Sequence, residues 1–345
     1  MTPRPFGCGL DPYNARMPID WAPFVELVRR HQRFLLTTHV RPDPDGLGSQ
    51  IALADVLESM GKQVQLLIAS NWPPRYTFLD PDRRIGRFEP PGELYRAAQV
   101  LVVLDTGTWN QLGDFGPFLK ASTAAKAVID HHLSQDDLGA LRLIDTTAEA
   151  TGRLVYEAVQ ALGQPLSEKA ANALFAAVAT DTGWFRHSNT SDATFALAEK
   201  LVKAGANPAW LHQQIYEQNT LARQRLIGAM LNRLQVVENG RIAFSEIHWA
   251  DYAATGAIPS DTEDMVDYTR EIIGVEVGLF FLEQKDGSVK ISFRSRARVD
   301  VARIAEQFGG GGHRLAAGAT MQTSLPEAQR RVLDAIRLAL PPLAG

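Results

Sequence analysis

Short, almost continuous apolar runs alternate with helical patterns over the first 205 residues of the chain. Near-continuous runs of valine, leucine and isoleucine are typical of parallel strands that are covered on both faces. The strands are predicted at residues 34–39, 64–69, 99–104 and 125–129, and the helices at residues 46–60, 154–162, 168–179 and 194–204. Strands that alternate with helices predict an α/β fold, here a mainly parallel sheet with helices on both faces.

The pattern changes after about residue 205. Residues 207–233 are helical in pattern almost throughout, which suits a connector. Beyond them, strand patterns separated by short turns predict two hairpins. The strands are predicted at residues 236–237, 241–247, 275–283 and 289–293, and helices at residues 262–273, 301–308 and 326–338. We therefore expect a smaller mixed-sheet α/β domain at the C-terminal end. The expected division is a loose extension (1–20), a first domain (21–205), a helical connector (206–233) and a second domain (234–340).

Length and composition narrow the class of protein. A chain of 345 residues suits two domains, and 45% hydrophobic with 21% charged residues is ordinary for a globular protein. The net charge of −4 argues against a general positive field that would hold long nucleic acid. A single cysteine, Cys8, excludes a disulfide within the chain and a zinc site built from cysteines.

Membrane and export signals are weak in the sequence. No apolar run approaches the ~18 residues of a membrane span, so no membrane association is expected. Residues 1–14 lack the apolar core of a signal peptide, and we expect a loose extension there. These features favour a cytoplasmic enzyme.

Residues able to bind metals follow the predicted strands. His39 ends the first strand, with Asp43 and Asp45 just after it, and Asp105 ends the third strand. The remaining members of the set are Asp130, His131 and His132 after the fourth strand, and Asp181 at the end of a predicted helix. Because the carboxyl ends of strands in an open α/β sheet line one crevice, we expect these side chains to converge.

Each of these residues also has an ordinary structural explanation. An Asp-Pro-Asp-Gly stretch is commonly a turn, and Asp105 or Asp181 alone is compatible with a helix cap. Two adjacent histidines directly after a buried strand are harder to explain in this way. Taken together, five aspartates and three histidines at four element ends favour a functional site.

The ligand types suit two divalent metal ions. Asp43, Asp45, Asp105 and Asp181 carry four negative charges, which balance two ions of charge +2. Without cations such a cluster repels itself. Mixed imidazole and carboxylate ligands favour Mn²⁺ over Mg²⁺, and a carboxylate on a central strand, such as Asp105, is placed to bridge the two ions.

The motifs resemble those of the DHH phosphoesterases. The series His-x-x-x-Asp-x-Asp, a strand-end aspartate, Asp-His-His and a fourth aspartate matches that family in order. Residues 309–318, Gly-Gly-Gly-Gly-His-Arg-Leu-Ala-Ala-Gly, resemble the signature of the DHH-associated domain. Length and motif order are most similar to the bacterial oligoribonuclease and 3′-phosphoadenosine 5′-phosphate phosphatase subgroup, the nanoRNases.

The resemblance implies a role for each matching residue. One metal would be held by His39, Asp43 and Asp105, and the other by Asp45, Asp105, His131 and Asp181. His132 would contact the scissile phosphate, and Asp130 would orient a histidine. Substrate contacts are implied for Arg186, Asn189, Arg294, Gly311, Gly312 and His313. Pro44 stands where glycine is common in the family, which stiffens the loop but leaves both flanking aspartates in place.

The resemblance also implies an activity. The expected enzyme hydrolyses short oligoribonucleotides and linear dinucleotides to mononucleotides, and 3′-phosphoadenosine 5′-phosphate to AMP, by two-metal activation of a water. Its partner would be a short single-stranded RNA or dinucleotide, and a homodimer is compatible with the sequence. Alternatives are a RecJ-like single-strand exonuclease, a soluble inorganic pyrophosphatase, and a catalytically inactive nucleotide-binding protein.

Overall fold

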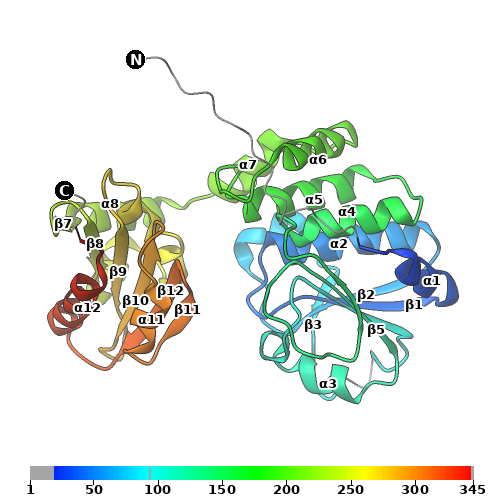
Figure 1. Ribbon diagram of the computed structural model, residues 1–345, viewed down its shortest axis with the longest axis horizontal. Helices are drawn as coiled ribbons and strands as arrows, with labels where there is room; N and C mark the ends of the chain where they lie inside the picture. The colour runs from blue at the N-terminus through cyan, green and yellow to red at the C-terminus, as the bar shows by residue number, and fades with distance from the viewer. Residues whose placement is uncertain (1–18, 93–94, 343–345) are drawn as a thin grey trace. The chain divides into compact units, whose positions relative to one another are not determined.

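The computed structural model describes residues 19–92 and 95–342 (Figure 1). The chain forms two compact units that meet in sequence between Gln218 and Asn219. Helix α7 (Pro208–Tyr216) belongs to the first unit and α8 (Leu221–Asn232) to the second, so the segment predicted as a connector is divided between them. Cys8 and most of the predicted N-terminal extension lie outside the described residues.

The first unit is built on a six-stranded sheet in the order β3-β2-β1-β4-β5-β6. Every neighbouring pair in it is parallel, which confirms the predicted sheet. The strands are β1 (Arg33–Thr37), β2 (Gln63–Ile68), β3 (Ile85–Arg87), β4 (Val100–Leu104), β5 (Ala125–Asp130) and β6 (Leu141–Ile144). Strands β3 and β6, which the sequence analysis did not predict, are the two short edge strands, with too few apolar residues to stand out.

Alternate residues of these strands enter two separate cores. In β1, Phe34 and Leu36 face the larger core, whereas Leu35 faces the smaller one. The larger core is covered by helices α1, α2, α4, α5, α6 and α7, and the smaller by α3 together with the short helix η3 (Trp109–Leu112). Figure 1 shows α2, α4 and α5 on one side of the sheet and α3 on the other. The bounds are α1 (Ala22–Arg30), α2 (Pro44–Ser59), α3 (Phe115–Ala121), α4 (Thr151–Ala161), α5 (Glu168–Asp181) and α6 (Asp192–Lys203).

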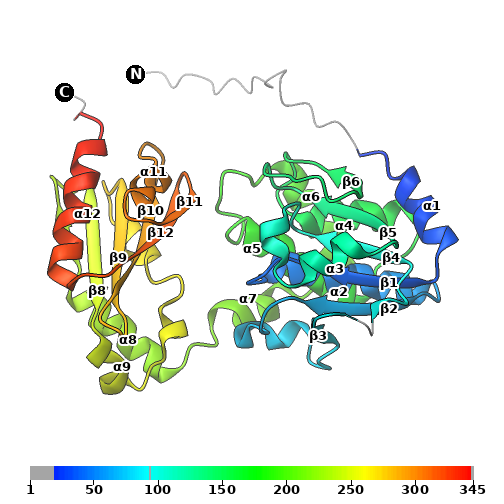
Figure 2. The ribbon, with the colours of Figure 1, turned by 90° about the horizontal axis from the view of Figure 1, so that it is seen from below.

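The second unit contains a mixed sheet in the order β11-β12-β10-β9-β8-β7 (Figure 2). Its strands are β7 (Gln235–Val237), β8 (Ile242–Ile247), β9 (Val277–Glu283), β10 (Val289–Ser295), β11 (Gly311–His313) and β12 (Ala316–Met321). Both predicted hairpins form, β7 with β8 and β9 with β10, while β8 and β9 run parallel. Helices α11 (Val301–Glu306) and α12 (Leu325–Ala339) cover one face, and α8 and α9 (Trp249–Thr255) the other.

The prediction of a helix at residues 262–273 is wrong. The structure has only a short 3₁₀ turn, η4 (Pro259–Thr262), and a single helical turn, α10 (Asp267–Arg270). Asp264 between them has a φ of +63°, which a continuous right-handed helix does not allow. The apolar pattern in this stretch reflects instead the burial of Met265 and Val266, which pack with Phe280 and Leu282 of β9.

The glycine run forms an edge strand of the second sheet. Gly311, Gly312 and His313 make up β11 and pair with Gly318, Ala317 and Ala316 of β12. The close approach of the two strands depends on missing side chains. A Cβ at Gly310 would lie 2.1 Å from the carbonyl oxygen of Gly318, whereas one at Gly311 would have no described atom within 4 Å.

We predict that Gly310→Ala destabilises the second unit, because its Cβ has no room against the β12 backbone. Overpacking of this kind typically costs about 1–3 kcal/mol. Gly311→Ala is the matched control in the same run, and its free energy of unfolding should be close to that of the wild type. Denaturant unfolding of the three proteins measures the difference. Equal stabilities for the two variants would contradict the observed strand pairing.

Candidate active site

The predicted metal-binding residues of the first unit converge at the carboxyl edge of its sheet. Strands β1, β4 and β5 are neighbours, and His39, Asp105 and the 130–132 segment follow them in turn. Helix α2 begins beside β1 and brings Asp43 and Asp45, and α5 ends on Asp181. The convergence expected from the topology is therefore present, drawn from residues that are far apart in sequence.

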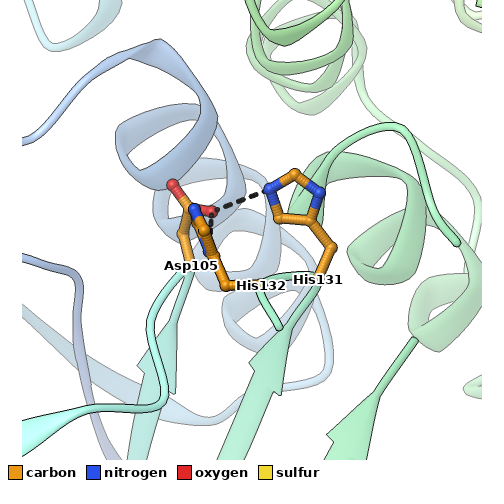
Figure 3. Close-up of side chains that lie close together, drawn as sticks. All are labelled: Asp105, His131 and His132. Atoms are coloured by element: carbon orange, nitrogen blue, oxygen red, sulfur yellow. Dashed lines mark ion pairs between the residues drawn. The ribbon is translucent and has the colours of Figure 1, made fainter. Parts of the chain in front are cut away.

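Asp105 lies at the centre of this group. Its Oδ2 is 3.3 Å from Nε2 of His39, and its Oδ1 is 3.6 Å from Nε2 of His131 and 3.7 Å from Nδ1 of His132. Figure 3 shows both adjacent imidazoles turned toward the same carboxylate. The side chain is buried, and the backbone has a φ of +63°, a costly conformation for a residue other than glycine. The two oxygens of Asp105 thus face two different sets of neighbours.

Three groups of side chains have ligand atoms within 4.8 Å of one another. They are His39 with Asp43 and Asp105; Asp45 with His131 and Asp181; and Asp105 with His131 and His132. Neighbouring groups share Asp105 or His131, so the whole set is one connected cluster of carboxylate and imidazole donors. Such donors suit divalent cations of the Mn²⁺ or Zn²⁺ type.

The hydrogen bonds of two histidines leave one nitrogen free for a cation. Nδ1 of His39 lies 3.0 Å from the carbonyl oxygen of Val40, and Nδ1 of His131 lies 3.1 Å from that of Ala148. Because a carbonyl only accepts, each Nδ1 carries a proton and Nε2 presents its lone pair to the carboxylates. A lone pair facing carboxylates needs a cation or a proton between them, so the donor set fits a metal.

Without a metal, protons take this role at several of the groups. Burial lowers the pKa of His39, but hydrogen bonds to Asp105 and Asp43 outweigh that effect and raise it well above its ordinary value. Burial, together with the charges of Asp105, Asp181 and Asp43, raises the pKa of Asp45. Burial also raises the pKa of Asp181 to about 6, with Asp105 and Asp43 adding to the rise and His131 opposing it. These carboxylates therefore compete for positive charge.

His132 is held through the same nitrogen as His131, but by a carboxylate instead of a carbonyl. Its Nδ1 lies 2.8 Å from Oδ1 of Asp130, which also accepts the backbone N–H groups of residues 131 and 132. Gln135 donates to Oδ2 of the same carboxylate at 2.5 Å. The hydrogen bond that His132 donates to Asp130 is the main cause that raises the pKa of His132 to about 9. Asp130 therefore orients His132, and Nε2 of that ring is left for another partner.

Sequence reasoning missed the start of helix α4, which supports two of the carboxylates. The backbone N–H groups of Thr151 and Gly152 donate to Asp45 at 2.8 and 2.9 Å, and the Thr151 hydroxyl donates to Asp105 at 2.9 Å. Gly152 is also required sterically, since a Cβ there would lie 2.7 Å from that of Ala177. The Thr-Gly pair just before the predicted helix 154–162 was the available signal.

Comparison with known proteins identifies the family. The DHH family N-terminal domain matches residues 33–178, and the DHHA1 domain matches residues 239–340. The chain is 30% identical over 316 residues to the bifunctional oligoribonuclease and PAP phosphatase NrnA of Bacillus subtilis, covering 90% of this chain and 96% of the relative. The chain belongs to the DHH family of phosphoesterases. It is a hydrolase of phosphoester bonds, and the recognition made from its motifs is confirmed.

Further relatives and solved structures agree with the DHH assignment. The protein of the same name from Thermus thermophilus is 30% identical over 309 residues, with 88% of each chain covered. An exopolyphosphatase-related protein from Bacteroides fragilis has the same fold, with a TM-score of 0.87 at 23% identity over 92% of this chain and 95% of the other. Exonuclease RecJ bound to manganese has a TM-score of 0.53 at 17% identity, over 95% and 97% of the two chains. Among residues 19–92 and 95–342, no helix is long and apolar enough to cross a membrane.

Two residues implied as substrate contacts lie beside the cluster of carboxylates and imidazoles. Asn189 donates to the backbone carbonyls of Glu149 and Asp181 at 3.2 and 3.3 Å, which ties its loop to the end of α5. Arg186 is exposed and donates to the carbonyl of Gly183 at 2.8 Å. The intervening backbone turns sharply, with φ values of +60° and +64° at Trp184 and Phe185. This loop therefore presents a cation and an amide next to Asp181.

The remaining implied contacts lie together on the sheet of the DHHA1 unit. Arg294 pairs with Ala316 across β10 and β12, and Ala316 pairs with His313 across β12 and β11. Residues directly opposite one another project from the same face of a sheet, so Arg294 and His313 flank a small alanine. Asp267 lies 3.8 Å from the Arg294 guanidinium. Gly311 and Gly312 form the exposed edge beside them.

We predict that Asp181→Asn stabilises the metal-free protein much more at pH 8 than at pH 4. A carboxyl whose folded pKa is about 6, against 3.8 when unfolded, destabilises the fold increasingly as the pH rises from 3.8 to about 6, and the full effect is present above pH 6. Because Asp181 is partly exposed, we discount the stability change that this pKa shift implies. The variant should gain about 1–2 kcal/mol in the free energy of unfolding, which raises Tm by roughly 2–6 °C.

The measurement is thermal unfolding in a chelator at the two pH values. The exposed Asp82, changed to asparagine, is the control for the charge change alone. A lower Tm for Asp181→Asn at pH 8 would contradict the repulsion inferred among the carboxylates.

Proposed function

We propose that this DHH phosphoesterase hydrolyses short oligoribonucleotides and linear dinucleotides to mononucleotides, and 3′-phosphoadenosine 5′-phosphate to AMP. The observation that carries the proposal is Asp105, whose two oxygens face separate ligand groups in a cluster with a near-balanced charge for two dications. The substrate class is supported by the relatives from two bacteria, each of which is a bifunctional oligoribonuclease and PAP phosphatase.

The proposal assigns six residues to two divalent ions. His39, Asp43 and Asp105 would hold one ion, and Asp45, Asp105, His131 and Asp181 the other. Two such ions, when bound, polarise a phosphoryl oxygen and lower the pKa of a water that attacks phosphorus. We propose Mn²⁺ because two imidazoles accompany the four carboxylates.

The chain's own residues would prepare the site for this reaction. Hydrogen bonds to carbonyls hold the proton of the neutral imidazole on Nδ1 of His39 and of His131, so Nε2 is the nitrogen that would bind a cation. Asp130 holds His132 with its Nδ1 protonated, so that Nε2–H of the imidazolium can donate to an oxygen of the scissile phosphate. His132 is therefore proposed to neutralise charge that develops on the phosphate, and not to bind a metal.

Residues of each unit are proposed to bind substrate. In the first unit, Arg186 and Asn189 would contact it next to the metal-binding cluster. In the second unit, Arg294 and His313, with the backbone of Gly311 and Gly312, would bind a phosphate or nucleotide of the substrate. A guanidinium and exposed N–H groups of an edge strand are suited to an anion.

We predict that dinucleotides are cleaved faster than twenty-nucleotide RNA, and that activity is lost in chelator and restored by Mn²⁺. The test incubates the protein with 5′-labelled RNAs of two to twenty nucleotides, 3′-phosphoadenosine 5′-phosphate and pyrophosphate, and resolves the products over time. Metal analysis of the active protein should give two ions per chain.

Each alternative function gives a different outcome in this panel. Faster cleavage of the longest RNA would favour a RecJ-like exonuclease, and turnover of pyrophosphate alone an inorganic pyrophosphatase. No turnover with any substrate would favour an inactive nucleotide-binding protein. A single tightly bound zinc, or full activity in chelator, would contradict the two-metal proposal.

We predict that Arg294→Ala and His313→Ala reduce kcat/KM on dinucleotides about ten- to a hundredfold while both metals remain bound. A hydrogen bond to a charged group is worth roughly 1.5–3 kcal/mol, and each 1.36 kcal/mol is a factor of about ten. Arg303, exposed and paired with Asp300 in the same unit, offers a control as Arg303→Ala. Lost Mn²⁺ in either variant, or an unchanged kcat/KM, would argue against the proposed substrate contact.

A further inference from the structure

Thr151 joins two of the central carboxylates through separate atoms. It is the first residue of α4 and is fully buried. Its backbone N–H donates to Oδ2 of Asp45 at 2.8 Å, and its hydroxyl donates to Oδ1 of Asp105 at 2.9 Å. One residue therefore sets the orientation of a carboxylate on α2 relative to a carboxylate at the end of β4.

The hydroxyl acts on the oxygen that most needs a fixed position. Oδ1 of Asp105 faces His131, while Oδ2 faces His39. Rotation about the Cβ–Cγ bond would move both oxygens out of these two directions at once. A donor on Oδ1 restricts that rotation, since hydrogen-bond energy falls steeply away from linear geometry.

Local structure frees the Thr151 side chain for this contact. A threonine near a helix start commonly bonds to its own backbone, but here the first turn of α4 is satisfied by the carboxylate of Asp45 instead. Gly152 donates the second N–H to that carboxylate at 2.9 Å. The residue before the helix is Ala150, which is extended and has no side-chain cap to offer. The N–H groups at the start of α4 thus donate to Asp45, and the Thr151 hydroxyl donates to Asp105.

We propose that Thr151 is a positioning residue, whose hydroxyl holds Asp105 in the orientation in which it serves two metal ions together. The inference rests on the proposed two-metal function and adds a residue to it. It requires a hydroxyl at position 151, whereas the contact to Asp45 needs only the backbone. Removal of the hydroxyl alone should therefore abolish the contact to Asp105 and leave the contact to Asp45 in place.

Thr151→Val is the decisive variant, because it keeps the size and branching of the side chain and the N–H to Asp45. Thr151→Ser restores the hydroxyl, and Thr151→Ala is a second variant in case valine is poorly tolerated. Thr255→Val is the control, since it removes a hydroxyl in the other unit that donates to the carbonyl of Asp251 and accepts from the N–H of Ala257, and that contacts no carboxylate in these two bonds. All four are made in the full-length chain, and circular dichroism checks folding.

The readouts are Mn²⁺ binding and the electron paramagnetic resonance spectrum of the bound ions, followed by kcat on a dinucleotide. In Thr151→Val and Thr151→Ala, we expect the second Mn²⁺ to bind at least tenfold more weakly and the spin-coupled signal of a metal pair to diminish. Their kcat should fall ten- to a hundredfold, as expected for the loss of one hydrogen bond to a charged group. Thr151→Ser should stay within about threefold of the wild type, and Thr255→Val should match it.

Three outcomes would overturn the inference. The first is a folded Thr151→Val that binds both ions with wild-type affinity and spectrum, which leaves the two-metal function intact and removes only the role of the hydroxyl. The second is a serine variant as impaired as valine, which points to packing instead. The third is a wild-type chain that binds no pair of ions, in which case the proposed function fails together with the inference.

Discussion

Repulsion among buried carboxylates is the constraint on which the rest of the first unit depends. At one edge of the sheet, Asp43 has a ligand atom within 4.8 Å of one on Asp105, and Asp45 has one within 4.8 Å of one on Asp181. Two like charges ~4 Å apart repel by about 4 kcal/mol at an effective dielectric constant of ~20. The fold opposes this repulsion with helix N-terminal N–H groups, which donate to Asp43 at the start of α2 and to Asp45 at the start of α4. The remaining compensation is left to a cation or to protons, which suits a site that binds metal.

Close packing of helices is what brings these charges together. The start of α2 lies against α5, where a Cβ at Gly48 would be 2.3 Å from the carbonyl oxygen of Ala173. At the start of α4, Gly152 has the same function against Ala177 of α5. Larger residues at either glycine would push the helices apart and separate Asp45 from Thr151 and Asp181. The interior is packed too densely to absorb such a change without movement, so small residues in the core are part of the site.

Much of this site was predictable, because the features that encode it are local. Near-continuous apolar runs such as residues 99–104 mark parallel strands, and Asp105 follows directly. Topology then implies that strand-end residues share an edge. Other features were not predictable, because they depend on contacts made only in the folded chain. The hydroxyl of Thr151 acts on a residue 46 positions away, and nothing in its own neighbourhood indicates that partner. The same holds for residues 262–273, where a residue pattern typical of a helix belongs to short turns with buried apolar side chains.

The adjacent histidines show where sequence reasoning reaches its limit in physical terms. His131 and His132 have the same side chain and follow the same strand, yet the backbone directs them to different partners. His131 donates a hydrogen bond from Nδ1 to a carbonyl, so its Nε2 can bind a cation, whereas His132 donates from Nδ1 to a buried carboxylate and remains a cationic donor. The difference comes from the Ala148 carbonyl and the Asp130 carboxylate, which lie on opposite sides of the 131–132 peptide in sequence. The chemical role of each histidine is decided by the acceptor that the fold places at its Nδ1, a carbonyl or a carboxylate, and residue type alone does not encode that choice.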